Sequence, residues 1–120
     1  MAPKKAAPVG RIAAQNRKAR HNYFIDDTVE AGIALVGTEV KALRLGRASI
    51  GEAYAAEQDG ELYLFNAHIG VYDAAREGHA PRRPRKLLLR RRELARLFAM
   101  VQREGVTLVP LSLYFNPRGI

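Results

Sequence analysis

The sequence feature that most constrains the fold is an Asp-Gly pair, Asp59-Gly60, which separates two stretches of strand-forming residues. Asp-Gly supplies the positive φ angles of a two-residue type I′ turn, the usual connection of a β-hairpin. In the second stretch, ELYLF, leucines alternate with aromatic residues, so the two kinds of side chain point to opposite faces of a strand. The residues from Ala53 to Phe65 therefore predict an antiparallel hairpin.

Further strands are predicted on either side of this hairpin. Runs of aromatic, β-branched and aliphatic residues predict them within residues 21–36, at 87–89 and over 106–115. Pro110 removes a donor from the last run, which must therefore be an edge strand or bulge there. Residues 66–86 hold glycines and prolines without periodicity, which predicts a long loop.

Three stretches are predicted to be helical. Residues 11–20 are rich in helix formers. Residues 91–104 carry an apolar face of Leu94, Leu97, Phe98 and Val101, and Gly105 can end that helix. In residues 37–47, GTEVKALRLGR, we expect Thr38 to cap the start and Gly46 to end the helix. Its apolar residues Val40 and Leu43 are expected to pack into a core.

At 120 residues the chain is long enough for one compact domain. About six short strands without βαβ alternation favour a mainly β (α+β) fold, a small antiparallel barrel of the oligonucleotide-binding type with two or three flanking helices. We expect residues 1–10, with Pro3, Pro8, Gly10 and two lysines, to form a disordered basic arm and residues 11–120 to form the single RNA-binding domain.

The composition excludes several classes of function. The chain has no cysteine, which excludes disulfides and thiolate chemistry and fits a cytoplasmic protein. No apolar run approaches the roughly 20 residues of a membrane span. The three histidines lack metal-ligand spacing, and no phosphate loop or nucleophile elbow is present. We therefore expect no enzyme, metal, cofactor, small-molecule substrate or membrane partner; a metal nuclease is the enzymatic alternative.

Positive charge is concentrated in two segments. The formal charge is +8, from 20 Lys and Arg against 12 Asp and Glu. Residues 1–25 contain six of these cations and residues 78–92 contain seven, and neither segment contains an acid. Such segregation favours a polyanionic partner, and nucleic acid fits better than anionic lipid because neither segment has the bulky apolar face of an interfacial helix.

Candidate RNA contacts follow from the residue types. Residues 16–23, NRKARHNY, combine cations for phosphates, amides for base edges, and rings for stacking. This interpretation covers Asn16, Arg17, Lys18, Arg20, His21 and Tyr23, although Tyr23 could equally be a core residue and His21 an ordinary strand residue. Lys41 and Arg44, three residues apart, share a flank of one helix and could equally be merely solvated.

Several blocks, in this order, resemble the small protein B (SmpB) family, the bacterial SsrA-binding partners of transfer-messenger RNA. They are NRKARHNYFI, EAGIALVGTEVKALRLGRASI, the DGE turn, RKLLL and REGVTLVPLSLYF, and the match covers about residues 15–115. The resemblance implies an oligonucleotide-binding-type barrel that grips the tRNA-like domain of this RNA. It also implies the ribosome as a second partner, in trans-translation on stalled ribosomes, and we expect a monomer.

The family's motif positions fall on specific residues of this chain. They are Asn16, Lys18, Arg20, His21, Tyr23, Glu30, Lys41, Arg44, Arg85, Lys86 and Leu88. Position 90, often His or Asn in the family, is Arg90, so a phosphate contact is expected to replace a base-edge contact there. The family's C-terminal strand and basic tail are expected to be absent, so that the chain binds RNA without completing rescue. The alternative is a ribosomal or ribosome-assembly protein with the same barrel.

Overall fold

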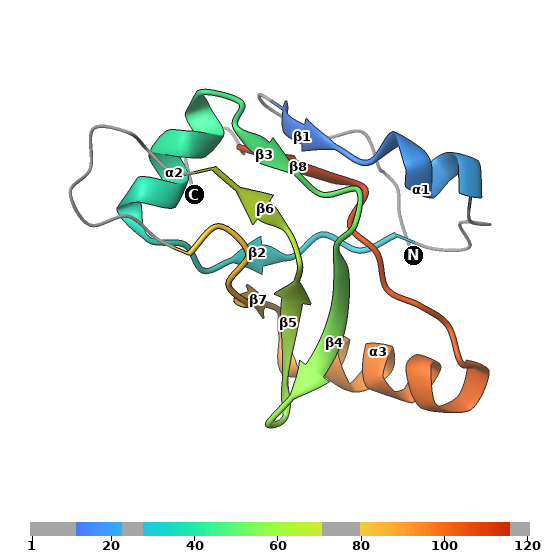
Figure 1. Cartoon of the computed structure of the whole chain (residues 1–120). Helices are drawn as coiled ribbons and strands as arrows, with labels where there is room; N and C mark the ends of the chain where they lie inside the picture. Colours follow the sequence, from blue (N-terminus) through green and yellow to red (C-terminus); the bar gives the residue numbers. More distant parts are fainter. Residues whose placement is uncertain (1–11, 23–27, 71–79, 116–120) are drawn as a thin grey trace.

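The structure is a computed structural model that describes residues 12–22, 28–70 and 80–115, without the side chains of residues 20–22. It is an α+β fold built from short antiparallel strands (Figure 1). The strands are β1 (Ile12–Gln15), β2 (Gly32–Ile33), β3 (Ala48–Ser49), β4 (Tyr54–Gln58), β5 (Glu61–Phe65), β6 (His68–Ile69), β7 (Arg85–Leu88) and β8 (Ser112–Tyr114). The helices are α1 (Arg17–Asn22), α2 (Gly37–Arg44) and α3 (Arg91–Glu104).

The largest sheet has the strand order β2-β7-β5-β4, and two smaller sheets pair β1 with β8 and β3 with β6. The predicted hairpin is confirmed, since β4 and β5 pair in register from Tyr54 opposite Phe65 to Gln58 opposite Glu61. The turn has the expected positive φ angles, 54° at Asp59 and 81° at Gly60. The predicted strand at 87–89 is also confirmed, as β7.

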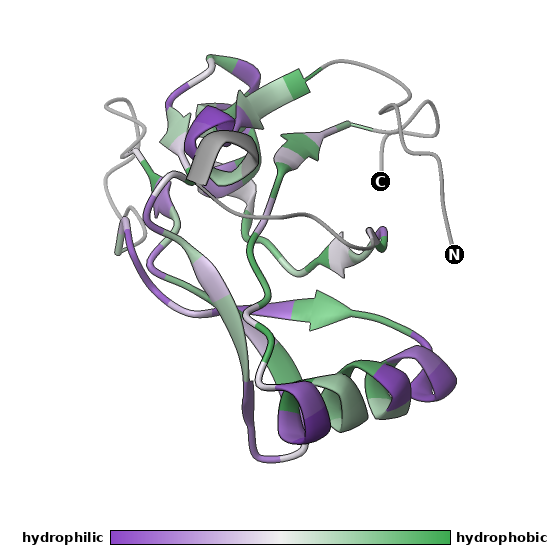
Figure 2. Cartoon of the chain, turned by 90° about the vertical axis from the view of Figure 1, so that its right-hand side faces the viewer, coloured by the Kyte–Doolittle hydropathy of each residue, from purple (hydrophilic) through white to green (hydrophobic). Residues whose placement is uncertain are grey.

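The helix predicted over residues 91–104 is confirmed as α3, and Gly105 ends it in the left-handed conformation at φ 65°. Leu94 and Leu97 are buried against Leu62 of β5, so α3 covers one face of the hairpin (Figure 2). Val101 was expected on this apolar face, but it is 39% exposed. The C-terminal end of α3 extends past the edge strand β4, and no described strand lies opposite it there (Figure 1).

The helix predicted over residues 37–47 is present as α2, and Gly46 adopts the expected positive φ, 73°. The expected Thr38 cap is wrong, because Val36 occupies the N-cap position. The Glu39 carboxylate accepts the Val36 N–H at 2.9 Å and performs the capping role from inside the helix. The buried face is Glu39, Ala42 and Leu43, whereas Val40 is only half-buried.

The helix predicted over residues 11–20 is only half right. Its first half is β1, which pairs with β8, because tertiary pairing overrides the helix propensity of two alanines. The helix α1 starts after Asn16, whose Oδ1 accepts the Ala19 N–H at 3.1 Å. The predicted strand around Tyr23 lies outside the described residues.

Two further expectations are corrected. Within the expected loop of residues 66–86, β6 forms and pairs with β3, and the first residues of β7 also lie inside that range. The run from 106 to 115 is interrupted as Pro110 predicted: Leu108 makes an isolated bridge to Ala55 on β4, and β8 begins only at Ser112.

Three groups of buried apolar residues form the core. One lies around Ile50 and Leu64, a second joins α2 to Ile69, and a third joins α3 to Leu62. Leu113 packs against the first two groups and Leu87 against the first and third, so the sheets share one connected interior. Among the described helices, none has the length and apolar character that crossing a bilayer requires.

Candidate nucleic-acid interface

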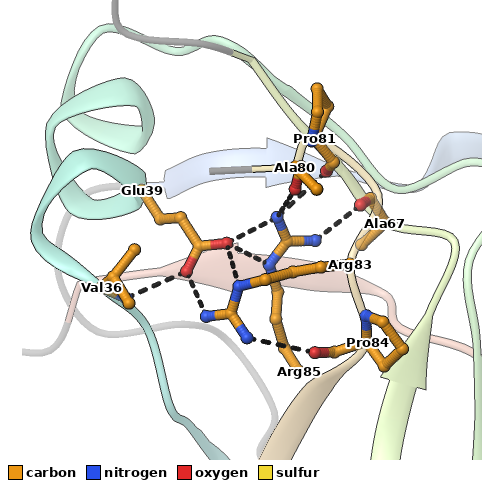
Figure 3. Close-up of polar contacts among 8 residues, drawn as sticks. All are labelled: Val36, Glu39, Ala67, Ala80, Pro81, Arg83, Pro84 and Arg85. Atoms are coloured by element: carbon orange, nitrogen blue, oxygen red, sulfur yellow. Dashed lines mark hydrogen bonds and ion pairs between the residues drawn. The ribbon is translucent and has the colours of Figure 1, made fainter. Parts of the chain in front are cut away.

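A buried cluster of charged side chains fixes α2 against the segment that leads into β7 (Figure 3). The Glu39 carboxylate, fully buried on α2, accepts hydrogen bonds from two arginines. Arg83 donates from Nε at 3.0 Å and Nη2 at 2.6 Å, and Arg85 donates from Nε at 2.7 Å. The remaining Arg85 nitrogens donate to the carbonyls of Ala67 at 2.7 Å and Pro81 at 3.0 Å. The carboxylate thus joins α2 to residues 83–85, and Arg85 extends the contact to Ala67 and Pro81.

The cluster is charged, and two guanidinium groups compensate the negative charge of the buried carboxylate. Burial raises the pKa of the Glu39 carboxyl, but hydrogen bonds from Arg83, the Val36 backbone and Arg85 outweigh it, so the pKa lies below its ordinary value. Burial lowers the pKa of the Arg85 guanidinium, which remains protonated because arginine is effectively always charged in proteins. The cluster therefore carries one negative and two positive charges.

The position of Arg85 in this cluster argues against a direct contact of its side chain with RNA. Its side chain has no exposed surface, so it cannot touch a phosphate from this position, and the contacts above give it a structural role. Sequence reasoning missed Glu39 as its partner. Two features of the sequence could have indicated Glu39. Its spacing places it on the same helix face as Ala42 and Leu43. A buried arginine from a segment without acids must also pair with an acidic residue from another part of the chain.

Asn16 is likewise an interior residue. Its amide Nδ2 donates to the carbonyls of Pro110 at 2.9 Å and Ile50 at 3.2 Å, while its Oδ1 caps α1. The side chain therefore holds the start of α1 against the loop after β3 and the segment before β8. Like Arg85, Asn16 is therefore a buried residue that holds elements with exposed cations in place.

The structure brings the two acid-free segments into one chain of contacts. Lys18 on α1 lies 3.2 Å from the Glu52 carboxylate, and the Glu52 carbonyl accepts a hydrogen bond from Asn66 Nδ2 at 3.2 Å. The Asn66 Oδ1 in turn accepts one from Arg82 at 2.8 Å. The helix α1, with exposed Arg17 and Lys18, is thereby connected to the segment that precedes β7.

Two further groups of candidates are exposed on other elements. Lys41 and Arg44 lie on the solvent side of α2, away from the face that carries Glu39. On β7, Leu88 is 50% exposed, and Lys86 is partly exposed with its Nζ 3.9 Å from the Glu61 carboxylate. Arg90 and Glu30 are exposed as well.

Glu30 and Arg90 lie beyond the paired ends of β2 and β7. The pairing ends at Gly32 opposite Leu88, with Ile33 opposite Leu87. Glu30 lies two residues before Gly32, and Arg90 lies two residues after Leu88. Of the remaining candidates, Arg20 and His21 lie in α1, but their side chains, like the whole of Tyr23, lie outside the described residues. Over the part of the chain that the structure describes, no three His, Asp or Glu side chains gather as metal ligands would.

Comparison with known proteins gives a consistent result. The family model described as "SmpB protein" matches residues 13–120. A curated "SsrA-binding protein" from Bradyrhizobium sp. (strain BTAi1) is 57% identical over 120 residues, covering 99% of this chain and 76% of the relative. Another from Methylobacterium sp. (strain 4-46) is 58% identical over 120 residues, with the same coverage of 99% and 76%.

A solved structure agrees with these relatives. It is described as "tmRNA-SmpB: a journey to the center of the bacterial ribosome", and one of its chains superimposes on this fold with a TM-score of 0.71. The two chains are 53% identical, and the match covers 88% of this chain and 74% of that chain.

Proposed function

This chain belongs to the SmpB protein family, and we propose that it is an RNA-binding adaptor for the tRNA-like domain of transfer-messenger RNA, in trans-translation on stalled bacterial ribosomes. Family membership across residues 13–120 is the observation that carries this proposal. The relatives bear the name of an SsrA-binding protein, and the solved structure joins that RNA, SmpB and the ribosome. The adaptor has no chemistry of its own and works in the cytoplasm.

The proposed contact surface consists of exposed side chains on several elements. They are Arg17, Lys18, Glu30, Lys41, Arg44, Lys86, Leu88 and Arg90. The surface also takes in Arg20, His21 and Tyr23, whose side chains lie outside the described residues. The cations neutralise phosphates, which supplies most of the affinity. Glu30 accepts a hydrogen bond from a base or orients a neighbouring arginine. Asn16 and Arg85 act indirectly, because their side chains hold α1 and α2 in place.

We further propose that residues 11–120 form one domain in which the three sheets close into a barrel of the oligonucleotide-binding type. One link between sheets supports this closure: the bridge from Ala55 on β4 to Leu108, which lies in the segment that leads into β8. Leu113 supports it too, since it packs against two of the three core groups. Such barrels bind nucleic acid on a sheet face and in their loops.

The test is a salt titration of binding to transfer-messenger RNA with a matched pair of variants. If about five phosphates are neutralised, log affinity falls with log salt at a slope of roughly −3.5 to −4.5. The Lys41→Ala/Arg44→Ala variant removes two proposed contacts from α2 and should flatten that slope by about 1.4–1.8. The control, Arg96→Ala/Arg103→Ala, removes the same charge from exposed positions of α3 and should leave the slope unchanged.

Two results would contradict the proposal. A titration with almost no salt dependence would show that phosphate neutralisation does not drive binding. Equal losses in the two double variants would show that net charge, and not the surface that includes α2, determines affinity. Binding of ribosomes with no preference for transfer-messenger RNA would instead favour a ribosomal or assembly protein.

A further inference from the structure

The outer face of the β4–β5 hairpin carries three aromatic residues that none of the contacts above uses. The register sets Tyr54 opposite Phe65 and Ala56 opposite Tyr63. Side chains alternate along a strand, so these residues lie on the face opposite Leu62, whose side chain packs under α3. Figure 2 shows α3 on one side of the hairpin, while no described helix covers the other side.

The three rings on this face lie in a row, and two of them are stacked. The centroids of Tyr54 and Phe65 lie 5.5 Å apart with 22° between the ring planes. Tyr63 continues the row, with its centroid 6.3 Å from that of Phe65 at a tilt of 44°. Tyr54 is 45% exposed, so part of its ring remains open to a ligand.

Positive side chains border the rings. Lys86 lies opposite Tyr63 in the register of β5 and β7, on the same sheet face. Arg82 donates to both the carbonyl and the side-chain oxygen of Asn66, the residue directly after Phe65, at 3.1 and 2.8 Å. Glu61, the acid on this face of β5, is paired with Lys86. Aromatic rings bordered by cations match the chemistry of an unpaired nucleotide.

We propose that Tyr54 and Phe65 form a stacking platform for one unpaired base of transfer-messenger RNA, with Lys86 and Arg82 on the phosphates beside it. This inference rests on the proposed function and extends its contact surface from Lys86 and Leu88 onto the hairpin. A protein partner fits less well, because the rings are bordered by cations, which match the phosphates of a nucleotide. Every base has a π face, so the platform supplies affinity without reading sequence.

The test compares two substitutions of Tyr54 in the full chain. Tyr54→Leu keeps an apolar side chain but removes the ring, and Tyr54→Phe keeps the ring. Loss of one stacked base should weaken binding to transfer-messenger RNA by about 5- to 160-fold in Tyr54→Leu. Tyr54→Phe should stay within about twofold of the wild type. The salt slope should be the same in all three proteins, since no cation is removed.

The outcomes separate this inference from the proposed function. If the wild type does not bind the RNA, the proposed function fails. If the wild type binds and Tyr54→Leu binds equally well, or loses only ribosome binding, the platform is wrong and the function stands. Should Tyr54→Leu fail to fold, a Tyr54→Trp variant replaces it. Quenching of its fluorescence by added RNA supports stacking, and unchanged fluorescence at saturating RNA overturns it.

Discussion

Replacing Glu39 with glutamine removes a fully buried negative charge on which two arginines converge. Glutamine has nearly the same volume, so the packing around it is preserved. It leaves the buried guanidinium of Arg85 without a counter-charge and turns an N–H₂ donor toward groups that are themselves donors. Breaking a buried ion pair by removing one partner costs about 3–5 kcal/mol. A domain of 120 residues has a total stability of about 6–18 kcal/mol, so the variant loses a large share of it.

Urea unfolding followed by circular dichroism measures this loss. With a slope of about 2 kcal/mol per molar urea, the midpoint should fall by about 1.5–2.5 M, while the slope itself stays constant. The matched control is Glu52→Gln, which breaks the ion pair with Lys18 in which both side chains are more than half exposed, 68% and 64%. That change should cost less than about 1 kcal/mol.

A second comparison separates charge from packing. The double variant Glu39→Leu/Arg85→Met leaves no unpaired charge at these two positions, but it also leaves the carbonyls of Ala67 and Pro81 without their donor, at a cost of about 1–3 kcal/mol for each buried carbonyl. It should therefore remain less stable than the wild type. If the free energies of unfolding of Glu39→Gln and Glu52→Gln agree within about 0.5 kcal/mol, the reasoning about this cluster is refuted. Burial would then make no difference to how much an ion pair stabilises the fold.

Three further predictions concern stability. The lowered pKa of Glu39 means that its contribution is fully present above its ordinary value near 4.5 and is lost as pH falls through the lower folded value. The gap between wild type and Glu39→Gln in urea midpoint should therefore shrink below about pH 4.5; a gap that widens in acid would contradict this sign. Gly60→Ala should lower the stability measured by thermal unfolding by about 1–2 kcal/mol, because φ is 81° there. Gly37→Ala, with open space around it, should not lower the stability of the protein. Equal effects of the two substitutions would refute the argument from backbone strain. Asn16→Ala should cost about 1–3 kcal/mol for its unsatisfied carbonyl partners, and any loss of RNA affinity should accompany that loss of stability. A loss of affinity without loss of stability would make Asn16 a direct contact.

The elements that local chemistry determines could be predicted from the sequence. The Asp59-Gly60 turn permits few other geometries, and both its φ angles are positive as expected. The helix α3 has a strong apolar period and a glycine at its end, and its bounds were predicted to the residue. In these places propensity, pattern and tertiary packing all favour the same structure.

Elements that depend on distant partners could not be predicted. The sequence of β1, IAAQ, favours a helix locally and becomes a strand only because β8 pairs with it across the whole length of the chain. The same holds for β6, two residues long, which exists by pairing with β3. Such short strands carry no period of their own, so only the assembled sheet defines them.

In the candidate site, too, features that depend on residue type could be predicted, and features that depend on distant partners could not. Residue types indicated correctly that Arg17 and Lys18 on α1 and Lys41 and Arg44 on α2 are exposed, because charge at the surface needs no partner to be predicted. They did not show that Arg85 and Asn16 point inward, since burial of a polar side chain depends on acceptors far away in sequence, Glu39 for the first and Pro110 for the second. Composition gives the charge of a segment, whereas tertiary contacts decide which of its charges meet solvent.

The most direct measurement is the sequencing of RNA that co-purifies with this chain from bacterial cells, beside the Lys41→Ala/Arg44→Ala variant. Transfer-messenger RNA should be enriched over its cellular abundance and over elongator tRNA with the wild type, and that enrichment should fall with the variant. Recovery of ribosomal RNA and tRNA merely in proportion to their abundance, with the same profile for both proteins, would contradict the account.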